Sequence, residues 1–269
     1  MDNGELSHLS ERAFNGLTNL PFLTFSGSNL SEKLNQMIFA DLKMVETLNM
    51  DKFRIEKLES EDLFAKMKNL KNLALYLNTL TFINDTIFKN LYNVVSLRLS
   101  SSKIENIDAN AFEHLYLLQN LELDDNNLTR LEAVTFRNLK KLTKLELQDN
   151  KLKVIEAKLF ENLTKLEELN LRTNQLETIE AFAFQNCHHL SIISLQDNKI
   201  QRLDDKFTFI GLDSIKNLNL LDNPIKSIHP EIFKYIFNKT TNINISCSYL
   251  ESEELRMLGV RHLFPDKSL

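Results

Sequence analysis

A motif of eleven residues recurs along the chain and limits the folds that it can adopt. The pattern L-x-x-L-x-L-x-x-N-x-L occurs at 118–128, 142–152 and 166–176, so its period is 24 residues. Further copies, some of them weaker, lie at 20–30, 45–55, 70–80, 94–104, 190–200, 215–225 and 241–250. A period of this length predicts a solenoid, in which each repeat is one turn that buries its apolar side against the next.

The second half of each repeat carries two more apolar columns. A phenylalanine stands fourteen residues before the Asn of the motif, at Phe14, Phe39, Phe64, Phe88, Phe112, Phe136, Phe160, Phe184 and Phe209. Three residues later comes Leu17, Leu42, Met67, Leu91, Leu115, Leu139, Leu163, Cys187 or Leu212. Stacking would bring each set into a column, which explains half of the 18 Phe residues without an aromatic ligand site.

The L-x-L segment predicts a short parallel strand, whose two leucines point inward and whose middle residue points outward. The motif Asn stands where the chain leaves the strand, and its amide can satisfy turn backbone groups. We call this column the Asn ladder; it comprises Asn78, Asn126, Asn150, Asn174, Asn198 and Asn223. Phe53 occupies the equivalent position in a weaker repeat and predicts a local irregularity.

The 24-residue repeat with Phe in its second half resembles the extracellular type of leucine-rich repeat. Toll-like receptor ectodomains, Slit-type proteins and secreted leucine-rich immune proteins of insects have this form, and the segment KLFENLTKLEELNLRTNQL (158–176) is similar to the mosquito proteins among the last group. The resemblance implies an α/β-type leucine-rich repeat horseshoe of about ten repeats. Its parallel β-sheet would line the concave face, and its convex side would be irregular or short-helical.

For the domain organisation we expect one solenoid over 1–247, with an incomplete first repeat, and a helical cap over 248–269. The relatives usually carry cysteine-rich caps, whereas here Cys247 is followed by Ser248 and Tyr249. The first ten residues, MDNGELSHLS, lack the basic and apolar blocks of a signal peptide. We therefore expect a fragment of a longer protein.

Several kinds of chemistry find no support in the sequence. The net charge of −5 comes without a basic stripe, and no apolar run could span a bilayer, which excludes nucleic acid and membrane insertion. No catalytic or phosphate-binding motif occurs, so we predict no enzyme and no cofactor. Cys187-His188-His189 suggests a metal, but Cys187 falls in the buried Leu column. A Cys187–Cys247 disulfide is excluded, because the two cysteines lie about two and a half repeats apart, which corresponds to roughly 12 Å.

The concave face is the predicted binding surface, because solenoids bind partners there. The candidate residues are Tyr76, Arg98, Glu122, Asp124, Glu146, Gln148, Glu168, Arg172, Ile192 and Leu221. Glu122 and Glu146 would face each other on adjacent strands, and the acidic middle repeats favour a basic partner. The alternative is that water, Lys144 and Arg172 screen these charges. Tyr76, Leu77, Ile192 and Leu221 would supply apolar anchors on both sides of the acidic centre.

N-glycan acceptor motifs occur at Asn29, Asn84, Asn127, Asn162 and Asn238, and a sixth, Asn244, is predicted to point to the concave face. Their number is only slightly above chance for this composition. We expect a non-enzymatic protein-binding module that is secreted or on the cell surface and acts in innate immunity. An intracellular scaffold or substrate-recognition subunit is the alternative, and a fragment of a larger receptor is a third reading. A dimer or hetero-complex stays open.

Overall fold

A computed structural model describes four stretches of the chain, residues 9–27, 34–58, 62–236 and 242–246. The described part forms two compact units, which we treat separately. The first unit comprises Met1–Leu128 with Val134–Leu142, and the second comprises Thr129–Ala133 with Thr143–Leu269. The sequence predicts one solenoid over 1–247, without this division. The expected cap at 248–269 lies outside the described residues, as do Asn29, Asn238 and Cys247.

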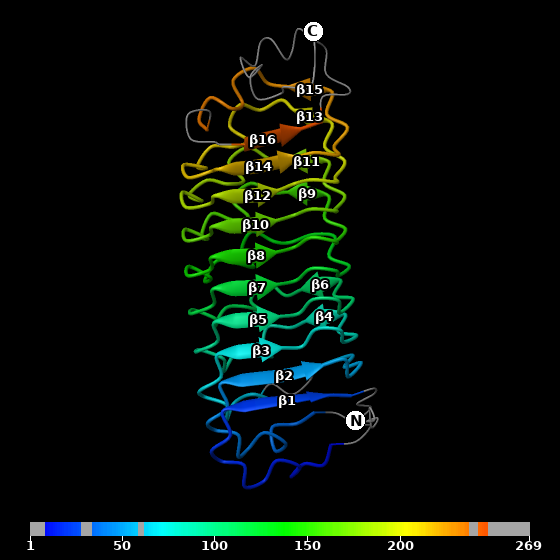
Figure 1. The fold of residues 1–269 in the computed structure, drawn as a ribbon, viewed down its shortest axis with the longest axis vertical. Helices are drawn as coiled ribbons and strands as arrows, with labels where there is room; N and C mark the ends of the chain where they lie inside the picture. Colours follow the sequence, from blue (N-terminus) through cyan, green and yellow to red (C-terminus); the bar gives the residue numbers. More distant parts are fainter. Residues whose placement is uncertain (1–8, 28–33, 59–61, 237–241, 247–269) are drawn as a thin grey trace. The chain divides into compact units, whose positions relative to one another are not determined.

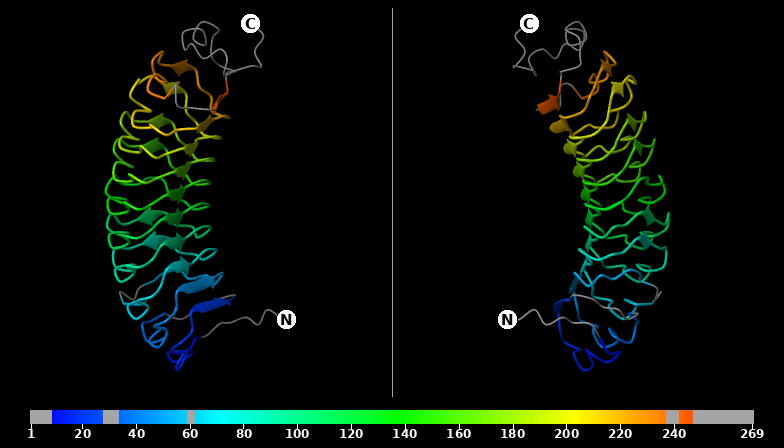
Figure 2. Two further views of the ribbon diagram at one scale, coloured as in Figure 1. Left: turned by 60° about the vertical axis from the view of Figure 1, so that its left-hand side comes forward. Right: turned by 90° about the vertical axis from the view of Figure 1, so that its right-hand side faces the viewer.

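Parallel strands stack in chain order in the first unit (Figure 1). They are β1 (Phe22–Ser26), β2 (Thr47–Asp51), β3 (Asn72–Ala74), β5 (Ser96–Arg98) and β7 (Asn120–Glu122). The register follows the repeat, since Leu97 pairs with Leu121 across 24 residues. Two shorter strands, β4 (Phe82–Ile83) and β6 (Asn106–Ile107), pair with each other. Figure 2 places them on a different side of the coil from the main strands.

The second unit repeats this arrangement. Its main strands are β8 (Lys144–Glu146), β10 (Glu168–Asn170), β12 (Ile192–Ser194), β14 (Asn217–Leu220) and β16 (Asn242–Ile245). Its short strands form two pairs, β9 (Val154–Ile155) with β11 (Thr178–Ile179), and β13 (Arg202–Leu203) with β15 (Ser227–Ile228). Turns connect the strands, and the described residues contain no helix. The predicted parallel-strand solenoid is confirmed, with irregular connections rather than short helices.

The core of both units consists of the predicted apolar columns. In the first unit, the rings of Phe88 and Phe112 stack at a centroid distance of 6.2 Å, and those of Phe112 and Phe136 at 6.4 Å. In the second unit, Phe184 stacks on Phe209 at 6.3 Å, and Phe233 extends the column at 6.0 Å. Each buried ring contributes roughly 1.5–3 kcal/mol. Leu17 departs from the prediction with 43% exposure, because it lies in the first described turn.

The Asn ladder residues are buried and connect consecutive turns through their amides. Asn126 accepts hydrogen bonds from the backbone N–H groups of Ser102 (3.1 Å) and Ile104 (2.9 Å) in the preceding turn. Its Nδ2 donates to the carbonyls of Leu99 and Leu123, both at 3.0 Å. One side chain therefore satisfies four backbone groups that would otherwise be buried without a partner.

Of the turns whose ladder position the structure describes, two lack an Asn there, and both carry an additional left-handed residue. The residue before the ladder position has a positive φ in each described turn from Lys52 to Asp222. Only the turns of Phe53 and Ser102 have a second residue with a positive φ, directly after the ladder position. These residues are Arg54 (φ 54°) and Lys103 (φ 67°). Phe53 itself is fully buried, with its ring 5.2 Å from that of Phe25. The irregularity expected at Phe53 therefore takes the form of this second left-handed residue.

Candidate functional site

The outward face of the main sheet in the first unit carries a compact cluster of polar and aromatic side chains. The strand register places Ala74 beside Arg98 and Arg98 beside Glu122. Asp51 is the last residue of β2, and Tyr76 follows β3 two residues after Ala74. We call the group Asp51, Tyr76, Leu77, Arg98 and Glu122 the Tyr76–Arg98 patch.

Arg98 is held at the centre of this patch by contacts on two sides. Its guanidinium carbon lies 4.9 Å from the centroid of the Tyr76 ring, within the range of a cation–π contact. Its Nε donates to Glu122 Oε2 at 2.7 Å, and this bond raises the pKa of Arg98 above its usual value. Ala74 also points outward, yet it is only 4% exposed. The patch is thus a packed surface that already has a fixed shape.

Asp51 is a buried carboxylate at the edge of the patch, with 9% exposure. Its Oδ1 accepts a hydrogen bond from the backbone N–H of Tyr76 at 3.2 Å. Burial raises the pKa of Asp51 to about 6, although the Tyr76 bond and the positive charge of Arg98 oppose the shift. The sequence analysis did not select Asp51, because nothing in the repeat pattern indicates that its neighbours would cover it.

Leu77 adds an apolar side chain to the patch in an unfavourable backbone conformation. Its φ is 56°, in the left-handed region, and its side chain is 41% exposed. The same position holds Ser101 and Asp125 in the next turns of this unit, and Asp is a residue that tolerates this region. A left-handed conformation costs an L-residue such as Leu about 1–2 kcal/mol. An exposed leucine there is therefore a candidate for a binding role rather than a stabilising one.

The acidic residues of this face have partners within the first unit. Glu122 is paired with Arg98, as described above, and Asp124 Oδ1 accepts a hydrogen bond from Ser100 Oγ at 2.6 Å. The sequence predicts that Arg98 and Glu122 both point outward, but their contact was not among the predictions. Their spacing of one repeat could have revealed it, because residues 24 apart are strand neighbours in this fold.

The second unit holds the other predicted acidic residues. Lys144 Nζ lies 2.8 Å from Glu146 and 3.9 Å from Glu168, so one lysine neutralises part of both charges. Glu146 Oε2 and Gln148 Oε1 are buried without a hydrogen-bond partner. Arg172 is exposed and forms no ion pair with the described residues. Glu122 and Glu146 belong to different units, so the predicted contact between them stays a prediction.

The rest of the second unit's outward face is rich in amides, which the sequence analysis did not emphasise. Asn219 Nδ2 donates to Gln196 Oε1 at 3.1 Å, and Asn242 Nδ2 donates to Asn217 Oδ1 at 2.8 Å. Ile192 is 40% exposed beside Asn217, whereas Leu221 is half-buried. The two predicted apolar anchors of this unit thus lie among polar side chains, and Ile192 also neighbours the charged Glu168.

The Cys187-His188-His189 cluster does not converge on one point. Cys187 is fully buried, and burial raises the pKa of its thiol to about 12. His188 Nδ1 contacts Asp213 at 2.5 Å, while His189 Nδ1 contacts the carbonyl of Thr164 at 2.9 Å. Among the described residues, no group of three or more His, Cys, Asp or Glu side chains could hold a metal ion.

Four of the glycan acceptors lie in described segments. Asn84, Asn127 and Asn162 are half-buried, and Asn244 is exposed in β16. Asn84 Oδ1 accepts hydrogen bonds from the backbone N–H groups of Thr86 (3.2 Å) and Ile87 (3.0 Å), while no bond of its Nδ2 is seen in the described structure. Nδ2 is the atom that a glycan would modify, so the fold leaves Asn84 a candidate.

The chain belongs to the leucine-rich repeat family, whose model matches residues 68–128, 117–176 and 164–225. This fold is typical of protein-interaction modules, and members of the family are generally non-enzymatic. No curated protein sequence matches the chain significantly. Within the described residues, no helix is long and apolar enough to cross a membrane.

Solved structures of this family are similar to the chain. The TLR13–ssRNA13 complex has a TM-score of 0.74 at 26% identity, over 87% of this chain and 37% of TLR13. The Leptospira interrogans protein LIC12759 has a TM-score of 0.73 at 26% identity, over 90% of this chain and 59% of that one. A chain of the octameric Latrophilin 3, Unc5D and FLRT2 complex has a TM-score of 0.71 at 26% identity, over 84% and 70%. The chain thus spans less than two thirds of the first two relatives.

Proposed function

We propose that this chain is a protein-binding module and that the Tyr76–Arg98 patch of the first unit is its main contact with a protein partner. The observation that carries the proposal is the fixed Arg98, stacked on Tyr76 and bonded to Glu122. Tyrosine and arginine are among the residues that contribute most to interface energies. A side chain that is already ordered loses less conformational entropy when a partner binds.

The charge around the patch indicates the kind of partner. Asp51, Glu122, Asp124 and Asp125 lie on or beside it, against Arg98 and Lys52. This excess of negative charge favours a basic segment on the partner, with an apolar side chain placed against Leu77 and Tyr76. The strain at Leu77 supports this, because a residue selected for stability alone would be Asn, Asp or Gly.

Arg98→Ala tests the proposal directly, with Arg172→Ala as its matched control. Both arginines are exposed on the main sheet, but only Arg98 belongs to the patch. The purified chain is immobilised, and proteins from the medium of cells of the source organism are captured and quantified. A partner held by the patch should bind the Arg98 variant at least about tenfold more weakly, which corresponds to ~1.4 kcal/mol. It should bind the Arg172 variant normally.

Two results would count against the patch. One is a captured protein that responds equally to both substitutions, and the other is one that responds to neither. Circular dichroism of both variants must show intact folding, since Arg98 also contacts two neighbours. Varying the salt concentration adds a second criterion, because a partner attracted by charge should bind more weakly as the ionic strength rises.

We further propose that the module acts outside the cell, in recognition of the innate-immune type. The similarity to TLR13 and to the FLRT2-containing complex supports this setting. Expression behind a secretory leader followed by glycosidase digestion is the test. A mobility shift that is lost when all six acceptors, Asn29, Asn84, Asn127, Asn162, Asn238 and Asn244, are replaced by Gln would support secretion. Failure to be secreted, or secretion without a glycan, would favour the intracellular scaffold.

A further inference from the structure

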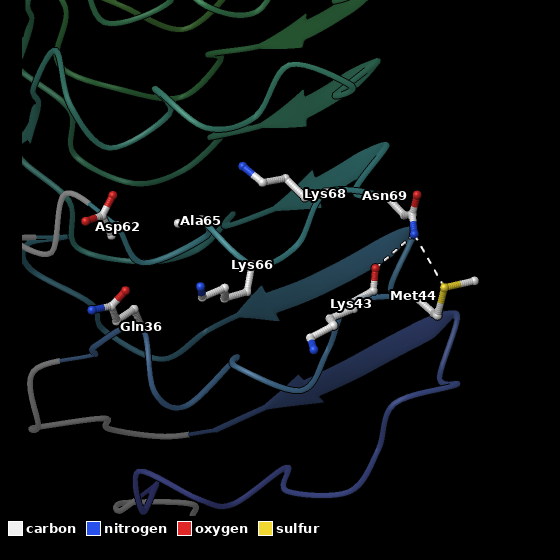
Figure 3. A pocket seen from close by; sticks show the side chains of 8 residues that line it. All are labelled: Gln36, Lys43, Met44, Asp62, Ala65, Lys66, Lys68 and Asn69. Atoms are coloured by element: carbon white, nitrogen blue, oxygen red, sulfur yellow. Dashed lines mark hydrogen bonds between the residues drawn. The ribbon is translucent and has the colours of Figure 1, made fainter.

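A hollow of about 630 Å³ opens on the first unit (Figure 3), and none of its lining residues belongs to the Tyr76–Arg98 patch. It lies between two consecutive turns, the segments that lead into β2 and into β3. Gln36, Lys43 and Met44 line it from the first turn, and Ala65 and Lys66 from the second. Its volume is within the range of sites that hold small molecules.

The hollow has a specific origin in the sequence. The residue after the core phenylalanine is Ala40 in one of these turns and Ala65 in the other. The following turns have long side chains there, namely Lys89, Glu113, Arg137, Glu161 and Gln185. The cores of the two turns are packed normally, since the rings of Phe39 and Phe64 stack at 6.1 Å. Of these two alanines Ala65 lines the hollow, so the space comes from a small residue on the surface, and the packing of the turns beneath it is unchanged.

The charges at the hollow are positive and only partly compensated. Lys43 and Lys66 form no ion pair with any described residue, and Figure 3 shows their side chains extending along the space between the turns. Lys68 extends instead toward the next turn, where its Nζ lies 5.8 Å from the centre of the Tyr92 ring. The nearby Asp62 is bonded to Asn90 at 3.2 Å and paired with Lys89 at 3.8 Å.

Neutral groups complete the lining. Asn69 Nδ2 donates to the carbonyl of Lys43 at 2.9 Å and lies 3.5 Å from Met44 Sδ, which joins the two turns at one margin. The Gln36 amide can donate to an oxygen atom, and Met44, which is 50% exposed, offers an apolar surface. Two ammonium groups without an ion-pair partner among the described residues, an amide and a thioether suit a small molecule that has both an anionic group and an uncharged part.

We propose that this hollow binds the phosphate or sulfate ester of a small molecule, with Lys43 and Lys66 holding the anionic group. Lysine ammonium groups bind such anions as point charges, and two of them match the two charges of a phosphate ester and exceed the single charge of a sulfate ester. The ester's uncharged part lies over Ala65, on the opposite side of the hollow from Met44 (Figure 3). This site is separate from the proposed protein-binding function, since none of its residues lies on the main-sheet face.

The test uses the full chain and three probes at constant ionic strength, glucose 6-phosphate, glucose 6-sulfate and glucose, each followed by isothermal titration calorimetry. At least one ester should bind saturably and glucose should not, and the two esters separate the phosphate source from the sulfate source. Lys43→Gln with Lys66→Gln should weaken ester binding at least about tenfold. Lys140→Gln with Lys141→Gln is the matched control, because it removes the same charge from the same unit outside the hollow.

A second variant separates shape from charge. Ala65→Gln fills the hollow with the residue that Gln185 provides at the same position of another turn, so the turn can accommodate it. It should also weaken ester binding at least about tenfold, with unchanged thermal unfolding. The site is ruled out if neither ester binds the wild type, if the control pair weakens binding as much as the Lys43 and Lys66 pair, or if Ala65→Gln binds normally.

Discussion

The two units have the same backbone plan but very different main-sheet faces. The first unit has a tyrosine stacked on an arginine, a buried carboxylate and a leucine in a left-handed conformation. The second unit has amides bonded to one another, and its left-handed positions hold Asp149, Thr173, Asp197 and Asp222. The left-handed positions of the second unit follow local backbone preference at Asp149, Asp197 and Asp222 but not at Thr173. The first unit differs in having an exposed leucine at this position and a buried carboxylate, Asp51, beside it.

This contrast separates positions that stabilise the fold, which point inward, from positions that can serve binding, which point outward. Positions that point inward repeat from turn to turn, because every turn must fill the same space. Positions that point outward are free to vary, and a conflict with local preference there indicates selection for something else. An exposed left-handed leucine and a buried carboxylate lie together in the first unit, which is why we place the protein contact there.

The largest expected effect tests whether the two backbones are in fact equivalent. Asn126→Ala in the first unit and Asn174→Ala in the second should each lower the free energy of unfolding by about 3 kcal/mol or more, because several buried backbone groups lose their partner. Chemical denaturation measures this loss. Asn127→Ala and Gln175→Ala, at the next residue in each unit, should cost no more than about 0.5 kcal/mol. A large loss in one unit alone would show that the ladders differ.

A smaller effect concerns Asp51, which is expected to make the first unit sensitive to pH. The folded state holds its proton up to a pKa of about 6, against 3.8 for an ordinary Asp. Its contribution to stability is therefore fully present below about pH 4, declines as the pH rises and is lost above 6. Asp51→Asn keeps an oxygen for the Tyr76 N–H, so it should equal the wild type near pH 4 and exceed it by about 2 kcal/mol at pH 7. An advantage that is the same at both pH values would disprove the role of the charge.

The smallest expected effect comes from exchanging the residue types that the two units have at the left-handed position before the Asn ladder. Leu77→Asn should raise the free energy of unfolding by about 1 kcal/mol, and Asp149→Leu in the second unit should lower it by a similar amount. Thermal unfolding of both variants measures this. If Leu77 serves binding, the more stable Leu77 variant should also lose affinity for a partner captured by the wild type. A Leu77 variant that is more stable and binds normally would remove Leu77 from the patch.

The sequence was sufficient for the repeat, the strand register and the buried columns, because these depend on spacing alone. It also placed Tyr76, Arg98 and Glu122 outward, and their period could have paired Arg98 with Glu122. It could not foresee the burial of Asp51 or the left-handed conformation of Leu77, which depend on how side chains from three consecutive strands cover one another. The helical alternative for the convex side was not realised in the described turns, since turns and two-residue strands take that place.

The sequence alone therefore determined the class of fold and the direction of most side chains. A chain with a 24-residue period of leucine, phenylalanine and asparagine has only one efficient way to bury its apolar residues and to provide hydrogen-bond partners for the backbone groups of its turns. The tertiary structure decided which outward residues act together. Arg98 reaches Tyr76 and Glu122, and Ala65 leaves a hollow beside Lys43 and Lys66, because these contacts depend on the size and rotamer of each side chain across neighbouring turns.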